Sequence, residues 1–214
     1  MIPGPVEQVC AYGVPTPVPF VPEVRAHLAP EPAGLWDRTA GEYRSAEPPP
    51  FWAFAWPGGQ GLARYLLDRP EVVAGRRVLD LATGSGLVAI AAALAGAARV
   101  RAVDVDPVAT TAVTLNAAAN GVAVDVSAVD ILDGDAGDAE VVLAGDAFYS
   151  APMARRVLAF LRRARQGGAV VLVGDPDREF LARRLFTAVA GYDVPTRPVL
   201  EDVTVRRTTI WRLR

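Results

Sequence analysis

The stretch between residues 76 and 106, RRVLDLATGSGLVAIAAALAGAARVRAVDVD, constrains the fold most. A mostly apolar run, Val78–Leu81, leads into a turn of small residues. The turn is followed by Leu87–Leu94, which contains neither Pro nor Gly, and then by a second apolar run, Val100–Val103. This order predicts a strand, a glycine-rich turn, a helix and a second strand. Because a right-handed crossover joins parallel strands, the turn is expected at the carboxyl edge of a sheet, where α/β proteins bind ligands.

Two acidic residues near this turn indicate which ligand the edge suits. Gly84 and Gly86 formally match the GxGxxG/A pattern of dinucleotide sites, which alone is a weak signal. Asp80, near the end of the first strand, would repel a pyrophosphate but attract the ammonium group of S-adenosylmethionine, directly or through water. Asp104 ends the second strand, where a carboxylate can accept both hydroxyls of a ribose. These residues favour S-adenosylmethionine over NAD.

The turn resembles motif I of the class I S-adenosylmethionine-dependent methyltransferases, (D/E)xGxGxG. Gly84 and Gly86 match two of its glycines, while Ala82 takes the place of the first. We expect Ala82 to lose any left-handed conformation, because a Cβ disfavours positive φ. The alternative is that the turn is only a tight connection between strand and helix.

Composition limits the remaining function classes. The chain has 214 residues, 51% of them hydrophobic, which is enough for one α/β domain with a sizeable core. A net charge of −2 predicts no nucleic-acid partner. One cysteine, Cys10, and one histidine, His27, predict no metal site, and His27 is expected at the surface or in packing. No long apolar stretch or signal-peptide pattern is visible, so we expect a cytoplasmic protein without a membrane partner.

The rest of the chain completes a doubly wound, seven-stranded, mostly parallel sheet of the Rossmann-like type. Residues 1–50 are predicted to form a Pro-rich N-terminal arm packed on a methyltransferase domain of residues 51–214. Further strands are expected at residues 124–129, 139–144, 168–174, 192–196 and 208–213, with residues 203–207 left open. Further helices are expected at residues 22–28, 34–39, 61–67, 107–120, 153–165 and 178–190.

Two more groups of residues are expected at the cofactor. The block FWAFAWPGGQ, residues 51–60, lies just before the first cofactor strand. Trp56 in this block can pack on a sulfonium cation, and Gln60 can bind a carboxylate. Asp130 and Ile131 follow the third strand and suit the amine and ring of adenine. The predicted cofactor set is Trp56, Gln60, Asp80, Ala82, Gly84, Gly86, Asp104, Val105, Asp130 and Ile131.

Within the methyltransferases, the chain resembles the electron-transfer flavoprotein beta-subunit lysine methyltransferase family. The resemblance covers nearly the whole chain and is carried by Pro50–Pro70, Val78–Gly86, Asp104–Pro107, Gly145–Tyr149 and Gly174–Arg178, with residues 16–36 also fitting. It implies a protein-lysine N-methyltransferase whose partner is the flavoprotein beta subunit. It also implies that Asp146 and Tyr149 form a DxxY/F signature and carry the catalysis.

The chemistry of methyl transfer agrees with this implication. The nucleophile must be a neutral amine held close to the methyl carbon and in line with it. A lysine with a pKa near 10.4 is about one part in a thousand neutral near pH 7.4. Asp146 can bind the incoming ammonium, and apolar walls then favour loss of its proton. Phe148, Tyr149 and Trp52 are predicted to form those walls, while Asp146 either steers the amine or acts as its base. A role for Asp146 as a helix N-cap and for Tyr149 in packing is the alternative.

Other functions stay open at this point. Methyltransferases of planar amines carry (N/D/S)PP(Y/F) after the fourth strand, whereas this chain has GDAFY. A small-molecule amine, such as a nicotinamide-like metabolite, is an alternative substrate. A non-catalytic cofactor-binding module is a further alternative, and an NAD-dependent dehydrogenase is disfavoured by Asp80.

Overall fold

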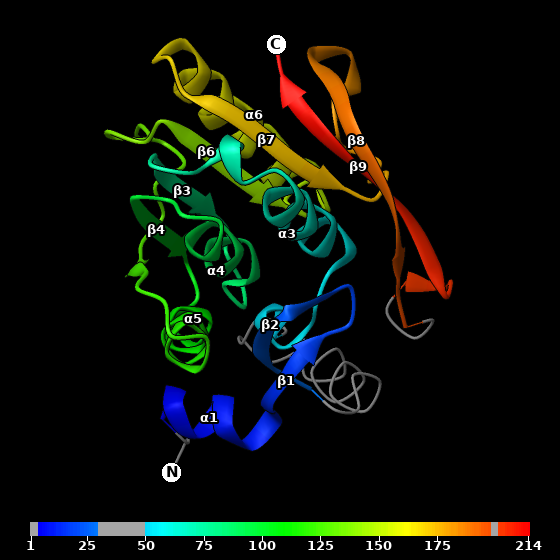
Figure 1. The fold of residues 1–214 in the computed structure, drawn as a ribbon. Helices are drawn as coiled ribbons and strands as arrows, with labels where there is room; N and C mark the ends of the chain where they lie inside the picture. The colour runs from blue at the N-terminus through cyan, green and yellow to red at the C-terminus, as the bar shows by residue number, and fades with distance from the viewer. Residues whose placement is uncertain (1–3, 30–49, 198–200) are drawn as a thin grey trace.

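The computed structural model describes residues 4–29, 50–197 and 201–214. Its centre is a seven-stranded sheet in the order β5-β4-β3-β6-β7-β9-β8. Strands β3 to β7 run parallel, whereas β9 is antiparallel to both of its neighbours (Figure 1). This topology confirms the predicted doubly wound, mostly parallel sheet. The strands are β3 Arg77–Leu81, β4 Arg99–Asp104, β5 Asp125–Ala128, β6 Val141–Gly145, β7 Val170–Asp175, β8 Phe186–Pro195 and β9 Val205–Leu213.

Helices cover both faces of the sheet because its strands are apolar on both sides. Helices α3 Pro57–Asp68, α4 Leu87–Leu94 and α5 Pro107–Ala119 contribute to one core, and α6 Ala151–Gln166 contributes to the other. In β6, Val141 and Leu143 pack in the first core, while Val142 and Ala144 pack in the second. Successive side chains of a strand point to opposite faces, which explains the nearly continuous apolar run.

The N-terminal residues form α1 Pro5–Tyr12 and a hairpin of β1 Val14–Val18 with β2 Val21–Leu28. The predicted helix at residues 22–28 is therefore wrong. Prolines at 15, 17 and 22 push each preceding residue into the extended region, which favours a strand. The buried side chains Val18, Val21 and Val24 pack against α3 and α4. The domain boundary at residue 50 stays a prediction, and the helix predicted at residues 34–39 lies outside the described residues.

The predicted helix at residues 178–190 is also wrong. Only a 3-10 turn, η3 Arg183–Leu185, forms there, and Phe186 begins the edge strand β8. Pairing with β9 along its whole length outweighs the helix preference of this Leu-, Ala- and Arg-rich segment. Two further 3-10 turns, η1 Phe51–Ala53 and η2 Pro70–Val72, flank α3.

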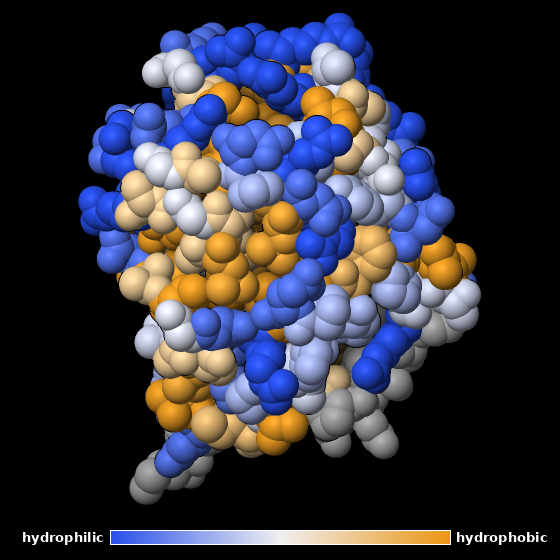
Figure 2. Space-filling model, in the orientation of Figure 1, coloured by the Kyte–Doolittle hydropathy of each residue, from blue (hydrophilic) through white to orange (hydrophobic). Residues whose placement is uncertain are grey.

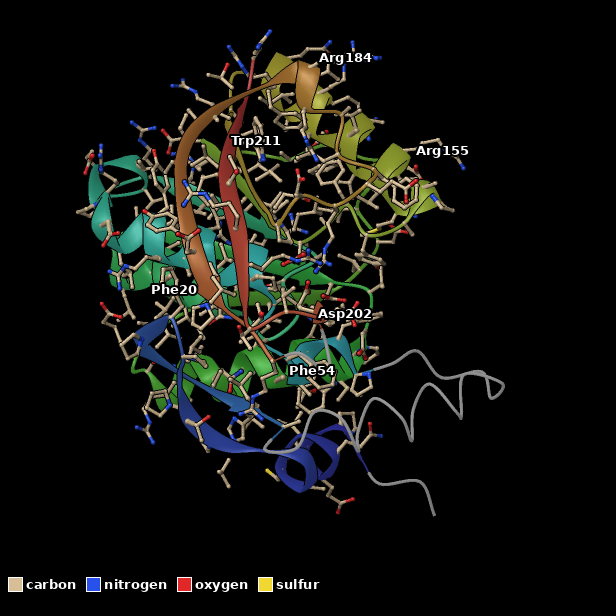
Figure 3. All side chains as sticks on the ribbon, turned by 90° about the vertical axis from the view of Figure 1, so that its right-hand side faces the viewer. Phe20, Phe54, Arg155, Arg184, Asp202 and Trp211 are labelled. Carbon is tan, nitrogen blue, oxygen red and sulfur yellow. The ribbon has the colours of Figure 1, made fainter. Side chains whose placement is uncertain are left out.

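The surface has distinct ends. Hydrophilic residues cover the end near the C-terminus, whereas apolar residues gather near the middle of the face over α3 and α4 (Figure 2). Arg184 lies at that hydrophilic end, while Phe54 and Asp202 lie toward the other end of the molecule (Figure 3). No helix within the described residues is both long and apolar enough to span a bilayer.

Candidate active site

A cavity of about 620 Å³ opens at the carboxyl edge of the sheet. Its walls come from the turn after β3, the tips of β4 and β6, the segment after β5, and residues 51–59. This volume lies in the range of sites for small organic ligands. The edge predicted from the first strand–turn–helix unit is therefore where the structure places the cavity.

The glycine-rich turn forms the floor of this cavity. Gly84 has a φ of 54° and Gly86, which caps α4, has a φ of 79°. A Cβ on Gly86 would lie 2.9 Å from Cγ1 of Val113 on α5, so close packing also requires a glycine there. Ala82 has a φ of 53°, which contradicts the expectation that an alanine would abandon the left-handed region. The turn imposes this conformation, and Ala82 carries the strain.

Asp80 lies beneath the turn and lines the cavity. Its Oδ2 accepts hydrogen bonds from Thr83 Oγ1 at 2.5 Å and from the backbone N–H of Ala89 at 3.1 Å. Burial raises the pKa of this carboxyl to about 7. Asp80 thus ties the turn to α4 and brings a partly ionised acid to the cavity.

Asp104 holds the other side of the turn. Its Oδ2 accepts from the backbone N–H of Gly84 at 2.9 Å, and its Oδ1 accepts from that of Asp106 at 3.1 Å. Burial raises the pKa of Asp104 as well. A carboxylate has about four acceptor sites, so these two bonds leave capacity for ligand hydroxyls. Val105 lines the cavity beside it and is largely exposed.

Asp130 and Ile131, which follow β5, also line the cavity. Asp130 accepts from the backbone N–H of Leu132 and pairs with Arg156 of α6 at 2.8 Å. The guanidinium of Arg156 lowers the pKa of Asp130, so this acid is fully ionised near neutral pH. Sequence reasoning missed Arg156, because nothing in the helical pattern of α6 distinguishes it from its neighbouring arginines.

Aromatic rings form one wall. Trp52 and Trp56 both line the cavity, and Nε1 of Trp56 donates to the Phe51 carbonyl oxygen at 2.9 Å. Phe51 stacks on Tyr149 with ring centroids 5.6 Å apart, and Phe54 meets the edge of Trp56 at 5.7 Å. Phe51 and Phe54 line the cavity too. The density of aromatic residues in the block FWAFAW was the signal that pointed to this wall.

Two predicted site residues do not reach the cavity. The amide of Gln60 accepts from the Phe20 N–H at 3.1 Å and donates to the Ala55 carbonyl at 2.7 Å, so it joins the N-terminal hairpin to α3. Phe148 is fully buried in the core under α6, where its ring meets the edge of the Phe186 ring at 6.3 Å. Ala147 contributes to the same core, whereas Tyr149 on the other side of Phe148 lines the cavity.

Asp146 follows β6 in a left-handed conformation, with a φ of 56°. Its Oδ1 accepts from Nε of Arg178 at 2.8 Å and forms an ion pair with Nη2 of Arg178 at 2.8 Å, and its Oδ2 accepts from the backbone N–H of Gly58. Burial raises its pKa to about 6, although the Arg178 charge opposes that rise. Ser150, not Asp146, caps α6, so the simple N-cap interpretation is wrong. Asp146 instead binds the N-terminus of α3, and its side chain lines the cavity.

Tyr149 lines the cavity three residues later and is half exposed, 50%. The chain also places Arg178 in the cavity wall, its guanidinium 6.0 Å from the Trp56 ring centroid. The sequence contained Arg178 within the segment GDPDR but gave it no role.

His27 is buried, and its ring Nδ1 and backbone N–H both bind Oδ1 of Asn116. Among the residues described, no three His, Cys, Asp or Glu side chains group as metal ligands would.

Known proteins similar to this chain define its class. Residues 64–173 match the family model described as Ribosomal protein L11 methyltransferase (PrmA). The fold is similar to that of a ribosomal protein L11 methylase from Lactobacillus delbrueckii subsp. bulgaricus, with a TM-score of 0.53, 21% identity, and coverage of 75% of this chain and 81% of that one. Fold and family together make the chain a class I methyltransferase, a class that uses S-adenosylmethionine.

Closer relatives define the family within that class. The electron transfer flavoprotein beta subunit lysine methyltransferase of Xenopus laevis is 37% identical over 199 residues, 90% of this chain and 80% of that protein. The protein of the same name from Rattus norvegicus is 40% identical over 199 residues, 90% of this chain and 77% of that protein. The chain belongs to the electron transfer flavoprotein beta subunit lysine methyltransferase family.

Proposed function

We propose that this enzyme methylates lysine side chains of the electron transfer flavoprotein beta subunit, with S-adenosylmethionine bound in the cavity at the carboxyl edge. One observation carries the proposal. Asp146 and Tyr149 lie in the wall of the same cavity as the glycine-rich turn and Asp104. A donor bound at the turn and an amine held at the tip of β6 would therefore meet.

The residues of this chain fit the cofactor. Asp104, fixed by two backbone N–H groups, offers acceptor capacity for ribose hydroxyls at the tip of β4. Asp130 and Ile131 suit the adenine end, and Asp80 with the turn suits the amino acid end. Trp56 places an aromatic face at the cavity wall, which suits a sulfonium cation. When bound, S-adenosylmethionine supplies an electrophilic methyl carbon on a positively charged sulfur.

The chain's own residues then prepare the amine. Asp146 accepts a hydrogen bond from the lysine nitrogen and fixes its direction toward the methyl carbon. Phe51, Tyr149 and Trp56 exclude water, which favours the neutral amine over the ammonium. The lysine nitrogen loses one proton to water, and its lone pair would then take the methyl group that bound S-adenosylmethionine would supply.

The test is transfer of radiolabelled methyl groups to purified electron transfer flavoprotein, compared with transfer to small-molecule amines such as nicotinamide. Asp146→Asn keeps the size of the side chain and removes its charge. We expect label on the beta subunit with the wild type and a large loss with Asp146→Asn. Asp125→Asn removes an equal charge from an exposed side chain that pairs with Arg99 away from the cavity, and it is expected to leave transfer unchanged.

Cofactor affinity, measured by calorimetry, separates the alternatives. Asp146→Asn is expected to bind S-adenosylmethionine as the wild type does, because its role is toward the amine. Label only in the small-molecule fraction would overturn the protein-lysine proposal. Cofactor binding without any transfer would instead favour a non-catalytic binding module.

A further inference from the structure

Arg178 is held between two buried carboxylates. Its Nε donates to Oδ1 of Asp146 at 2.8 Å, and its Nη2, which donates to Oε1 of Glu201 at 2.6 Å, forms an ion pair with the same Oδ1 at 2.8 Å. The side chains of Asp146 and Glu201 are only 7% and 2% exposed. The guanidinium is therefore the main compensating charge for Asp146 in a place that little water reaches.

Three segments far apart in the sequence build this arrangement. Asp146 follows β6, Arg178 follows β7, and Glu201 belongs to the connection between β8 and β9. Asp202, next to Glu201 in the sequence, lies on the side of Phe54 and far from Arg184 (Figure 3). The antiparallel pair β8–β9 thus delivers Glu201 to the carboxyl edge of the sheet.

The charges around Asp146 are nearly balanced. Glu201 also accepts from Nε of Arg206 at 3.1 Å, so two carboxylates face two guanidiniums. Asp175 is the remaining titratable neighbour: its Oδ1 accepts the backbone N–H of Arg178 at 2.7 Å, and its buried Oδ2 has no partner within the described residues. Burial raises the pKa of Asp175 to about 6, so it adds a negative charge only above that pH.

The hydrogen bonds of Asp146 nearly exhaust its capacity. A carboxylate offers about four acceptor sites. Hydrogen bonds from Nε of Arg178 and from the backbone N–H of Gly58 occupy two of them, and the ion-pair contact of Arg178 Nη2 lies against a third. One site is left on Oδ2, which is enough to orient a single N–H of a substrate amine.

An uncompensated carboxylate would be poorly suited to this task. It would stabilise the ammonium form of lysine, which has no lone pair for methyl transfer. Resting on the function proposed above, we propose that Arg178 is a positioning residue that neutralises Asp146, so that Asp146 orients the neutral amine without holding it as ammonium. Glu201 holds Arg178 in place, and its negative charge limits how far the positive charge of Arg178 neutralises Asp146.

The pH dependence of kcat tests this inference, because kcat reports the ionisation of groups in the enzyme–substrate complex. Rates of methyl transfer to saturating electron transfer flavoprotein would be measured between about pH 6 and pH 10, across the range where lysine loses its proton. Arg178→Gln removes the compensating charge. We expect its rise in kcat to move to higher pH by one to about three units, the usual effect of a close charge.

Two further variants fix the sign of the effect. Glu201→Gln removes the charge that opposes Arg178, so its rise in kcat should move to lower pH. Arg178→Lys retains a positive charge and should restore part of the wild-type profile. Arg207→Gln is a matched control, because Arg207 pairs with Asp193 on the exposed surface, 3.1 Å away, and its profile should equal that of the wild type.

Opposite shifts in Arg178→Gln and Glu201→Gln support the inference. If both variants lose kcat equally at every pH, Arg178 has only a structural role and the inference is overturned. If Arg178→Gln does not fold, the direction of the shift in Glu201→Gln decides alone. A wild-type enzyme without activity on the flavoprotein would overturn the proposed function and this inference with it, whereas wild-type activity with unshifted variants overturns the inference alone.

Discussion

The backbone of Gly58, at the start of α3, lies against the backbone of Gly174, near the end of β7. A Cβ added to either residue would overlap the carbonyl oxygen of the other. The same approach lets the Gly58 N–H donate to Oδ2 of Asp146, while the Gly174 carbonyl accepts from the Asp146 N–H at 2.9 Å. A contact between two glycines therefore fixes the position of the residue proposed to hold the amine.

Replacing Gly58 should disturb this contact. Gly58→Ala inserts a methyl group where the Gly174 oxygen and the Asp146 carboxylate lie, so we expect a loss of stability of about 1–3 kcal/mol. Gly59→Ala is the matched control, because a Cβ there would meet only Val88 and Leu87, at 3.9 Å and 4.0 Å. It should be neutral or stabilising by up to about 1 kcal/mol. Urea denaturation measures both, and equal stabilities would contradict the contact.

Ala82 should gain from becoming a glycine. Its φ of 53° is costly for any residue with a Cβ. We expect Ala82→Gly to raise the free energy of unfolding by about 0.5–1 kcal/mol, since glycine adopts this conformation without strain. Gly84→Ala, at a φ of 54°, should have the opposite sign. Thermal unfolding without cofactor is the measurement, and a destabilised Ala82→Gly would show that the turn is not strained.

Gln60 should matter for stability and not for the cofactor. Gln60→Ala leaves the Phe20 N–H and the Ala55 carbonyl without partners, at an expected cost of about 1–3 kcal/mol. The affinity of the folded protein for S-adenosylmethionine should stay as in the wild type. Calorimetric titration at a temperature where both proteins are folded provides the comparison. A tenfold weaker affinity would restore Gln60 to the cofactor site.

Phe148 and Tyr149 should separate stability from activity. Phe148→Ala opens a cavity in the core and is expected to cost about 3–5 kcal/mol. Tyr149→Ala removes a half-exposed ring stacked on Phe51, so it should cost less than about 1.5 kcal/mol. The methyl-transfer activity of Tyr149→Ala should nevertheless fall strongly, because the ring that excludes water from the amine is lost. Tyr149→Ala with wild-type activity would remove Tyr149 from the site.

Asp175 should make stability depend on pH. Its folded pKa of about 6 exceeds the ordinary value of 3.8, so the folded state binds its proton more tightly than the unfolded state does. The free energy of unfolding therefore falls as pH rises from about 4 to about 6. The nearby charge of Asp146 strengthens this effect, and that of Arg178 weakens it.

Asp175→Asn should remove this fall in the free energy of unfolding with rising pH. From about pH 4 to about pH 6, the free energy of unfolding of Asp175→Asn should rise relative to that of the wild type by on the order of 1 kcal/mol. Denaturant titrations at several pH values give the difference, in which the similar contribution of Asp80 cancels. A difference that does not change with pH would contradict the raised pKa.

The residues themselves determined the local unit around which the protein is built. Val78 to Asp104 specifies strand, turn, helix and strand through short-range preferences, and a right-handed crossover then places Asp80, Gly84 and Asp104 at one edge. The tip of β6, with Asp146 and Tyr149, follows from the same rule. These features depend on neighbours in sequence, so they could be predicted.

Only the tertiary structure decided the rest. Residues 186–195 became a strand because β9 offered an unpaired edge, against their own helix preference. Gln60 left the site because the hairpin supplied partners for its amide, and Phe148 turned into the core while Tyr149 faced the cavity. Arg178 gained its role only when β6, β7 and the β8–β9 connection brought two carboxylates to it. The two carboxylates that hold Arg178 lie 32 and 23 positions from it in the sequence, and no local pattern encodes such contacts.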